Sequence, residues 1–281
     1  MITVAVLSQK GGVGKTLTCA NLAAGLADRG HAVVMIDFDP QADLSASWAL
    51  DEDADRPRIE DSLEHTGEDD CDALAHIALG DGAGSLALLA TGHERLRRQT
   101  ARLLADDGRE LARLLEPLQG RFDVALVDTP AGDTVFGRQA IVAADAAIVP
   151  LLPGYHELRA LTRALDVLDE RAQHAQTTLE LLGVLVLNAD PRWRSTKEYG
   201  RHLQAMAAEQ RLALFDTLVP RHQPVTDHAR YGLPTVWLRP ASSVAVAYRE
   251  LADEVEGRLA ELDGDRAPRG HGLGVAGGCG R

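Results

Sequence analysis

Short apolar segments alternate along this chain with longer stretches in which apolar residues recur at helical spacing. The apolar segments contain few polar residues, which is typical of strands buried on both faces of a parallel sheet. We expect strands at residues 2–7, 32–36, 86–89, 124–127, 146–150 and 181–187. We expect helices at residues 16–29, 93–105, 109–118, 157–171, 196–210 and 244–262. The alternation predicts an α/β fold, with a mostly parallel twisted sheet and helices on both of its faces.

The same pattern predicts a single domain over residues 1–262, because no internal repeat and no linker divides it. Residues 263–281 are rich in glycine and contain almost no core-forming residues, so we expect a disordered tail there. Residues 51–72 are rich in carboxylates, and we expect them to form a solvated excursion at the surface.

Composition narrows the class of protein. Hydrophobic residues make up 45% of the 281 residues, and the formal net charge of −13 argues against a protein coated over its whole surface by nucleic acid. Cys19, Cys71 and Cys279 lack the spacing of metal ligands or of a disulfide framework. The N-terminus lacks the pattern of a secretory signal, and no run of about 18 apolar residues is present. We therefore expect a cytoplasmic protein without a membrane span.

The chain has only three lysines beside 26 arginines, and Lys10 and Lys15 both lie in a glycine-rich loop between the first strand and the first helix. A strand, a glycine-rich turn and a helix together point backbone N–H groups at an anion. A thin lysine stem can reach a phosphate between those groups, whereas an arginine fork cannot. We expect Lys15 to reach the β and γ phosphates of a nucleotide and the Thr16 hydroxyl to bind Mg²⁺ directly. The alternative is a glycine-rich turn without a ligand.

The nucleotide-binding residues expected in this loop are Gly11, Gly12, Val13, Gly14, Lys15, Thr16 and Leu17. The strict phosphate-loop pattern has glycine where Gln9 stands, and the chain follows the variant K-G-G-x-G-K-[ST] instead. The additional residue of that variant, Lys10, lies too early in the loop to serve the same phosphate from the same side.

Two further strands end in carboxylates. After the second strand, Asp37 and Asp39 stand at i and i+2, so both side chains are expected on one face of an extended chain. At the carboxyl edge of a parallel sheet, one of them could help to hold hydrated Mg²⁺ and the other could orient a water for attack on the γ-phosphate. A later strand delivers Asp128, where P-loop proteins hold Mg²⁺ through water. The alternative for each motif is an ordinary turn.

These motifs, in this order, resemble those of the ParA/MinD family of deviant Walker A ATPases. They are K-G-G-V-G-K-T at residues 10–16, D-F-D-P-Q at 37–41 and V-D-T-P at 127–130. Within the family the chain is most similar to ParA-type partition ATPases of the Soj kind, over residues 1 to about 262. The resemblance supports a single-domain P-loop NTPase.

The resemblance also implies roles for particular residues. Lys10 would cross a dimer interface to the phosphates held by the other subunit, and it would act with Lys15 and Asp39 in catalysis. Asp39 would position the attacking water and would belong to the metal site with Thr16, and Asp128 would hold Mg²⁺ through water. Near the base would lie Asn188, at the end of a strand, and Pro220, in a stretch that resembles the family's adenine segment.

The resemblance also implies binding partners for this chain. Two subunits would enclose two molecules of ATP with Mg²⁺, forming a homodimer with slow ATPase activity. A centromere-binding protein of the ParB type would stimulate hydrolysis. The dimer would bind DNA without sequence preference, would be nucleoid-associated in the cytoplasm and would need no membrane. Plasmid or chromosome partitioning is the activity that such an ATPase would serve.

The chain departs from the family pattern at several positions. Family members often have Gly-Asn where Ala42 and Asp43 stand, and many have a double proline and serine where residues 129–132 read T-P-A-G. An arginine implicated in DNA binding in the family aligns with Pro224. This last substitution weakens the expectation of DNA binding specifically.

The charge of residues 192–230 favours DNA binding all the same. The basic residues there outnumber Glu198, Glu209, Asp216 and Asp227, and they are Arg192, Arg194, Lys197, Arg201, Arg211, Arg221 and Arg230. The alternative is an ordinary solvated helix face. Because the loop begins near residue 10, no helix-turn-helix is expected before it, as in the short form of ParA.

Three other functions compete with partitioning. A MinD-like ATPase that patterns a membrane, or one that positions a protein assembly, would share the ATPase core, but the last predicted helix is acidic and shows no basic amphipathic anchor. A nitrogenase reductase would need interface cysteines for an iron–sulfur cluster, and suitable cysteines are missing. A nonhydrolytic switch is disfavoured by Asp39. The cargo stays open.

Overall fold

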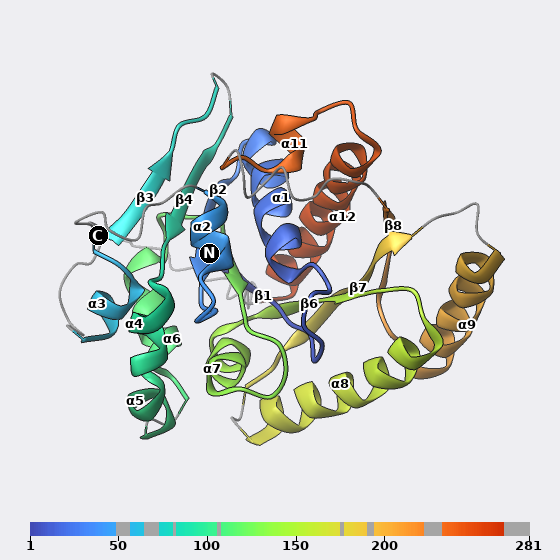
Figure 1. Ribbon diagram of the computed structural model, residues 1–281, viewed down its shortest axis with the longest axis horizontal. Helices are drawn as coiled ribbons and strands as arrows, with labels where there is room; N and C mark the ends of the chain where they lie inside the picture. The colour runs from blue at the N-terminus through green and yellow to red at the C-terminus, as the bar shows by residue number, and fades with distance from the viewer. Residues whose placement is uncertain are drawn as a thin grey trace, which may run out of the picture.

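One eight-stranded sheet forms the centre of the molecule, in the order β3-β4-β2-β5-β1-β6-β7-β8 (Figure 1). The computed structural model describes residues 1–48, 57–64, 73–80, 83–105, 108–174, 177–189, 194–221 and 232–266. The strands are β1 (Ile2–Val6), β2 (Ala32–Asp37), β3 (Leu74–Ile77), β4 (Ser85–Leu89), β5 (Val124–Asp128), β6 (Ala146–Leu151), β7 (Glu180–Ala189) and β8 (Leu214–Pro220). All neighbours are parallel except β3 and β4. The predicted mostly parallel α/β sheet is confirmed.

Helices cover both faces of the sheet because its central strands are buried on both sides. Along β1, Val4 and Val6 belong to one core, whereas Ala5 and the following Leu7 belong to the other. The first core is covered by α1 (Lys15–Asp28), α2 (Asp43–Ser47), α11 (Thr235–Leu238) and α12 (Ser243–Arg266). Helices α1 and α12 lie side by side (Figure 1), and Gly25 of α1 admits the close approach of Ala252.

The second core lies under the other helices. They are α3 (Ile59–Glu64), α4 (His93–Arg98), α5 (Thr100–Ala105), α6 (Glu110–Leu115), α7 (Val135–Ala143), α8 (Tyr155–His174) and α9 (Arg194–Gln210), with a 3₁₀ turn, η2 (Glu116–Leu118). No helix among the described residues has both the length and the apolar content needed to cross a bilayer.

Some elements differ from the prediction. The helix expected at 93–105 is divided at Gln99, whose side-chain amide donates to Glu64 Oε1 over 2.7 Å. Strand β8 was missed because it is an edge strand in which buried Phe215 and Val219 alternate with exposed residues, rather than a continuous apolar run. Helix α7 was also missed; Thr134 begins it by accepting a hydrogen bond from Gly137 N over 3.1 Å.

The expectation of a solvated excursion at residues 51–72 is wrong for the part that the structure describes. Within residues 57–64, Ile59 and Leu63 enter the second core, and Arg58 and Glu60 are only 2% and 1% exposed. The helix expected to end at residue 262 continues to Arg266, and residues 267–281 lie outside the described part.

Candidate nucleotide site

Three neighbouring strands bring the predicted motifs to one edge of the sheet. Strand β1 leads into the glycine-rich loop, β2 ends at Asp37 and β5 ends at Asp128. The register pairs Asp128 with Val6 on one side and with Asp37 on the other. The carboxyl ends of parallel strands are where α/β sheets bind ligands. Motifs that are far apart in sequence therefore meet where a nucleotide can bind.

The glycine-rich loop has the backbone that its sequence predicts. Gly12 and Gly14 have φ of 71° and 100°, a region that residues with a side chain rarely adopt. A Cβ atom on Gly14 would lie 2.8 Å from Leu187 Cδ1, so this glycine also admits the neighbouring strand. Helix α1 begins at Lys15, and its first N–H groups face the loop. The arrangement suits an anion.

A cleft of about 700 Å³ opens beside this loop. One wall is formed by the expected loop residues Gly11, Gly12, Gly14, Lys15, Thr16 and Leu17. The opposite walls come from residues 39–41 and 43, from residues 130–131 and 134–136, and from Arg97 with Thr100. Pockets for nucleotide-sized ligands have volumes in this range. Val13 does not line the cleft; its side chain is buried, with 4% exposed.

The two carboxylates of the D-F-D-P-Q motif do different things. Asp37 is fully buried; its Oδ2 accepts hydrogen bonds from Ser45 N and Ser45 Oγ over 2.7 and 2.6 Å. Asp39 is half-buried and lines the cleft, and its Oδ1 accepts from Gln41 N over 2.9 Å. Burial raises the pKa of Asp39, and the nearby Lys15 opposes that rise. The expectation that both carboxylates share one face toward the nucleotide is therefore wrong, and only Asp39 is available there.

Asp128 is a buried carboxylate whose surroundings suit a bound cation. It is fully buried, and neither carboxylate oxygen has a hydrogen-bond partner among the described residues. Burial raises the pKa of Asp128 to about 7; the nearby Thr16 hydroxyl, although it makes no hydrogen bond of normal geometry with Asp128, and the Lys15 ammonium partly offset that rise. An unpartnered buried carboxylate is costly unless a cation or water completes it. Asp128 with Thr16 thus fits a site for Mg²⁺.

Thr16 and Asp128 would supply few of the ligands that such an ion needs. No group of three or more His, Cys, Asp or Glu side chains that could hold a metal is present in the described part of the chain. Mg²⁺ commonly keeps several waters and binds few protein groups together with substrate phosphates. The sparse donor set is therefore what a nucleotide-dependent Mg²⁺ site requires.

Lys10 points away from the cleft that its own loop forms. It is absent from the lining, and its Nζ lies 2.7 Å from Oε1 of Glu157 on the first turn of α8. The Lys10 side chain is 58% exposed and that of Glu157 is 20% exposed. The two lysines of the loop thus face different surroundings, and Lys15 alone, 7% exposed, lies beside the cleft.

The expected base-binding residues lie together but outside the lining of the cleft. Ala189, which follows Asn188, pairs with Pro220 in the register of β7 and β8, and Arg221 N donates to Ala189 O over 3.0 Å. Asn188 has a φ of 58°, which asparagine tolerates better than most residues. Residues 190–193 and 222–231, with Pro224 among them, lie outside the described part. A role near the base stays a prediction.

Several residues of the cleft were not selected from the sequence. Gln41 and Pro130 stand inside the motifs but received no role, whereas Arg97 and Thr100 follow β4, where no motif marks them. The structure also bears on Ala42, a departure from the family pattern noted above. Ala42, where relatives often have glycine, has a φ of 56°, which favours glycine.

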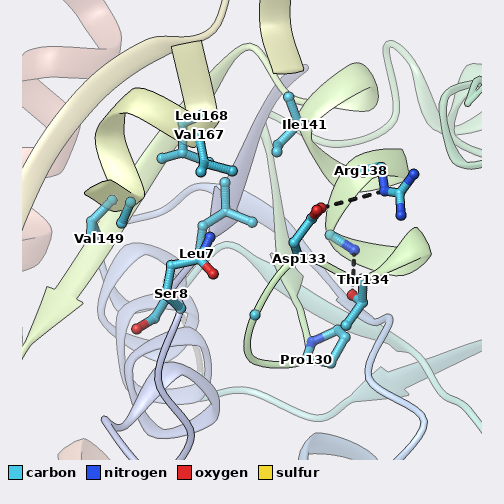
Figure 2. Close-up of a pocket in the computed structure, with 14 residues that line it drawn as sticks. Leu7, Ser8, Pro130, Asp133, Thr134, Arg138, Ile141, Val149, Val167 and Leu168 are labelled. Carbon is cyan, nitrogen blue, oxygen red and sulfur yellow. Dashed lines mark hydrogen bonds and ion pairs between the residues drawn. The ribbon is translucent and has the colours of Figure 1, made fainter. Parts of the chain in front are cut away.

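A second, smaller pocket of about 30 Å³ lies behind the phosphate loop (Figure 2). Apolar side chains line it from Leu7, which follows β1, and from β6, α7 and α8, and it shares Pro130 and Thr134 with the larger cleft. On the α7 side, Asp133 Oδ1 lies 3.4 Å from Arg138 Nε. A space of this size holds about one water molecule. The pocket therefore backs the two loops of the site and is too small for a nucleotide.

Comparison with known proteins extends the similarity beyond the motifs. The AAA domain family matches residues 1–181. The chromosome-partitioning ATPase Soj of Thermus thermophilus is 30% identical over 267 residues, which cover 92% of this chain and 96% of Soj. Cobyrinic acid a,c-diamide synthase from Mycobacterium smegmatis, solved with an ATP analog and magnesium, superposes with a TM-score of 0.75 at 28% identity and covers 92% of this chain and 96% of its own. The cell division ATPase MinD of Pyrococcus furiosus gives a TM-score of 0.69 at 25% identity, over 91% and 98%.

Proposed function

Because this chain belongs to the ParA/MinD family of P-loop ATPases, within the AAA domain family and with Soj among its relatives, we propose that it is an ATP-gated dimer that binds DNA and acts in plasmid or chromosome partitioning. Its cofactors are ATP and Mg²⁺, which the cleft, Thr16 and Asp128 suit. The partner that stimulates hydrolysis is a centromere-binding protein of the ParB type.

The position of Lys10 carries the proposal. A lysine that served its own nucleotide would line its own cleft, as Lys15 does, but Lys10 does not line that cleft and instead pairs with Glu157. An exposed ammonium at the edge of the phosphate loop can reach the nucleotide of a second copy placed opposite. Two positive charges, one from each subunit, would then act on each triphosphate, as phosphoryl transfer requires.

The other residues of the cleft have separate tasks. The Gly11–Gly14 backbone and Lys15 bind the phosphates, and Thr16 with Asp128 holds the ion that neutralises charge on them. Asp39, beside the opening of the cleft, orients the water for in-line attack on the γ-phosphorus, and the bond to the leaving β–γ bridging oxygen breaks. Closure by a second subunit would exclude other water and strengthen these interactions.

DNA binding would come from backbone electrostatics, despite the net charge of −13. Of the basic residues between 192 and 230, Arg201, Arg211 and Arg221 have described side chains, and all are exposed. A dimer would present each of them twice. The multiplied charge supports binding that depends on ATP.

A co-sedimentation assay with DNA, in ATP or in ADP and at several salt concentrations, tests the proposal. We expect binding in ATP only, weakening as salt rises. DNA binding that is the same in ATP and in ADP would contradict the proposal that ATP controls DNA binding. In parallel, Lys10→Ala should abolish ATP-dependent dimerisation and leave the monomer folded, whereas Arg98→Ala, a change of an exposed cation elsewhere, should not. Dimerisation that survives in Lys10→Ala would refute the role of Lys10 across subunits.

One alternative keeps the ATPase dimer and changes what it binds. The similarity to MinD favours an ATPase that positions a membrane-associated or protein cargo. Against a membrane surface, α12 carries Glu250, Asp253, Glu254, Glu256 and Glu261 beside Arg249 and Arg258. Vesicles containing anionic lipid, substituted for DNA in the same assay, separate the two functions: retention by vesicles but not by DNA would favour the alternative.

A further inference from the structure

A chain of buried hydrogen bonds leads from the nucleotide site into helix α3. Asp37 Oδ2 accepts from Ser45 Oγ over 2.6 Å, and Ser45 Oγ in turn accepts from Thr91 N over 2.9 Å. Thr91 Oγ1 then donates to Glu60 Oε1 over 2.5 Å. None of the four side chains is more than 2% exposed. The chain therefore joins three segments that are distant in sequence, without contact with water.

We call this chain of Asp37, Ser45, Thr91 and Glu60 the relay. Its far end, Glu60, is a carboxylate that is almost fully buried. Glu60 Oε1 also accepts from Gly92 N over 2.6 Å, while Oε2 is buried without a hydrogen-bond partner among the described residues. Arg58, equally buried, donates through Nη1 to Thr91 O over 3.0 Å. Burying a carboxylate with one oxygen unpartnered is unfavourable, whereas Glu60 Oε1 satisfies two buried donors, Thr91 Oγ1 and Gly92 N, that an apolar side chain would leave without a partner. Glu60 therefore ties α3 to the end of β4 through Thr91 and Gly92.

The near end of the relay controls the segment that carries Asp39. Asp37 Oδ1 accepts from Asp39 N over 3.3 Å, and Asp37 Oδ2 accepts from Ser45 N over 2.7 Å. One buried carboxylate thus holds both ends of the turn between β2 and α2. The Ser45 hydroxyl donates to Asp37 and accepts from Thr91 N, so the position of Thr91 helps to fix its orientation.

We propose that Glu60 is a positioning residue for ATP hydrolysis, which holds Asp39 in place through Thr91, Ser45 and Asp37. The proposal rests on the function proposed above, in which Asp39 orients the attacking water. Glu60 fixes Thr91 and Gly92 at the end of β4, and they hold Ser45. A displacement of about 1 Å at a reacting group can slow a reaction by about 100-fold. Loss of a link this far from Asp39 would cause a smaller defect, of about tenfold, in kcat rather than in ATP affinity.

Glu60→Leu and Glu60→Gln, measured by steady-state ATP hydrolysis, form the central test. We expect kcat of Glu60→Leu to fall about tenfold, with KM for ATP within twofold of the wild type. Glu60→Gln should recover most of the rate, because the amide oxygen can accept from both Thr91 Oγ1 and Gly92 N. The matched control is Glu64→Leu: Glu64, on the same helix, accepts from Gln99 Nε2 and has no part in the relay. Its kcat should stay within twofold.

Three results would overturn the proposal. They are a folded Glu60→Leu protein with the wild-type kcat, an equal loss of kcat in Glu64→Leu, and a fall in ATP affinity that accounts for the whole defect. If Glu60→Leu does not fold, Thr91→Val replaces it, because valine keeps the shape of threonine and removes one hydrogen bond. We expect the same loss of kcat in Thr91→Val. A wild-type kcat in Thr91→Val would also refute the proposal.

Asp39→Ala distinguishes failure of the relay from failure of the proposed function. If Asp39→Ala hydrolyses ATP at the wild-type rate, the assigned role of Asp39 is wrong and the relay has no target. If Asp39→Ala is inactive and Glu60→Leu is not impaired, only the relay is wrong. ATP-dependent dimerisation of Glu60→Leu should be unchanged, because Lys10 lies outside the relay; its loss would show a general structural defect instead.

Discussion

The ion pair between Lys10 and Glu157 should oppose dimerisation, and the substitution Glu157→Gln, which removes the ion pair, should strengthen dimerisation. If Lys10 serves the nucleotide of a second subunit, it must first leave Glu157 Oε1, which lies 2.7 Å from its Nζ in the single chain. Glutamine keeps the shape of the side chain and removes the charge that holds the lysine. The variant should therefore form dimers at lower concentrations of protein and ATP.

The size of the effect follows from exposure. Lys10 is 58% exposed, so solvent screens the pair and its value falls in the range of surface ion pairs, about 0.2–1 kcal/mol. A symmetric dimer must open two such pairs, which doubles the cost to about 0.4–2 kcal/mol. Since about 1.4 kcal/mol corresponds to a factor of ten, the dimerisation constant should rise about 2-fold to 30-fold.

Sedimentation equilibrium in the presence of ATP and Mg²⁺ measures this constant, in an Asp39→Ala background so that hydrolysis does not deplete the dimer. Asp166→Asn is the control, because it removes the same charge from an exposed position of α8. Raised salt should shrink the difference between Glu157→Gln and its parent. A constant for Glu157→Gln that equals those of Asp166→Asn and the parent would refute the argument that Glu157 restrains Lys10.

Three other substitutions test the local geometry. Ala42→Gly should raise the free energy of unfolding by up to about 1 kcal/mol in urea denaturation. Ala42 has a left-handed backbone that strains alanine but not glycine, and the strain removed should exceed the entropy that glycine adds to the unfolded chain; a lower free energy of unfolding would contradict this account. Gly14→Ala should lower Tm and abolish ATP binding in calorimetry, since its φ is 100° and the added methyl overlaps a leucine; normal binding would show that the loop tolerates a side chain. Hydrogen bonds from His31 and Arg29 lower the pKa of Glu256, so the stabilisation is present above the unfolded pKa and is lost as pH falls through the folded value. Glu256→Gln should therefore reduce Tm at neutral pH and less so near pH 3; a difference that is independent of pH would contradict that linkage.

The phosphate loop could be predicted from the sequence because local constraints define it. A buried strand, glycines and a helix start follow one another directly, and the positive φ values of Gly12 and Gly14 are what that spacing demands. The meeting of Asp39 and Asp128 with this loop could also be predicted, because parallel strands bring their carboxyl ends to one edge.

The role of Asp37 could not be predicted in the same way. The i and i+2 rule assumes an extended chain through Asp39, but β2 ends at Asp37 and the backbone turns there. Asp37 then meets Ser45, whose position depends on α2 and on Thr91. Glu60 was misjudged for a related reason: a carboxylate in an acidic stretch reads as solvated, and only tertiary packing buries it.

Under the proposed function, two glutamates outside the motifs should act on different steps of the same ATPase cycle. Glu157 contacts Lys10 at the surface, so its loss should change the proposed equilibrium between one subunit and two. Glu60 is buried and is linked to Asp39 only through other residues, so its loss should change the rate within a dimer already formed. A change in dimerisation alters the dependence of ATPase activity on protein concentration, whereas a change in positioning lowers the rate at saturating protein. Because neither substitution touches the partner of the other, the effects should combine independently, and the concentration dependence of the rate assigns each glutamate to its step.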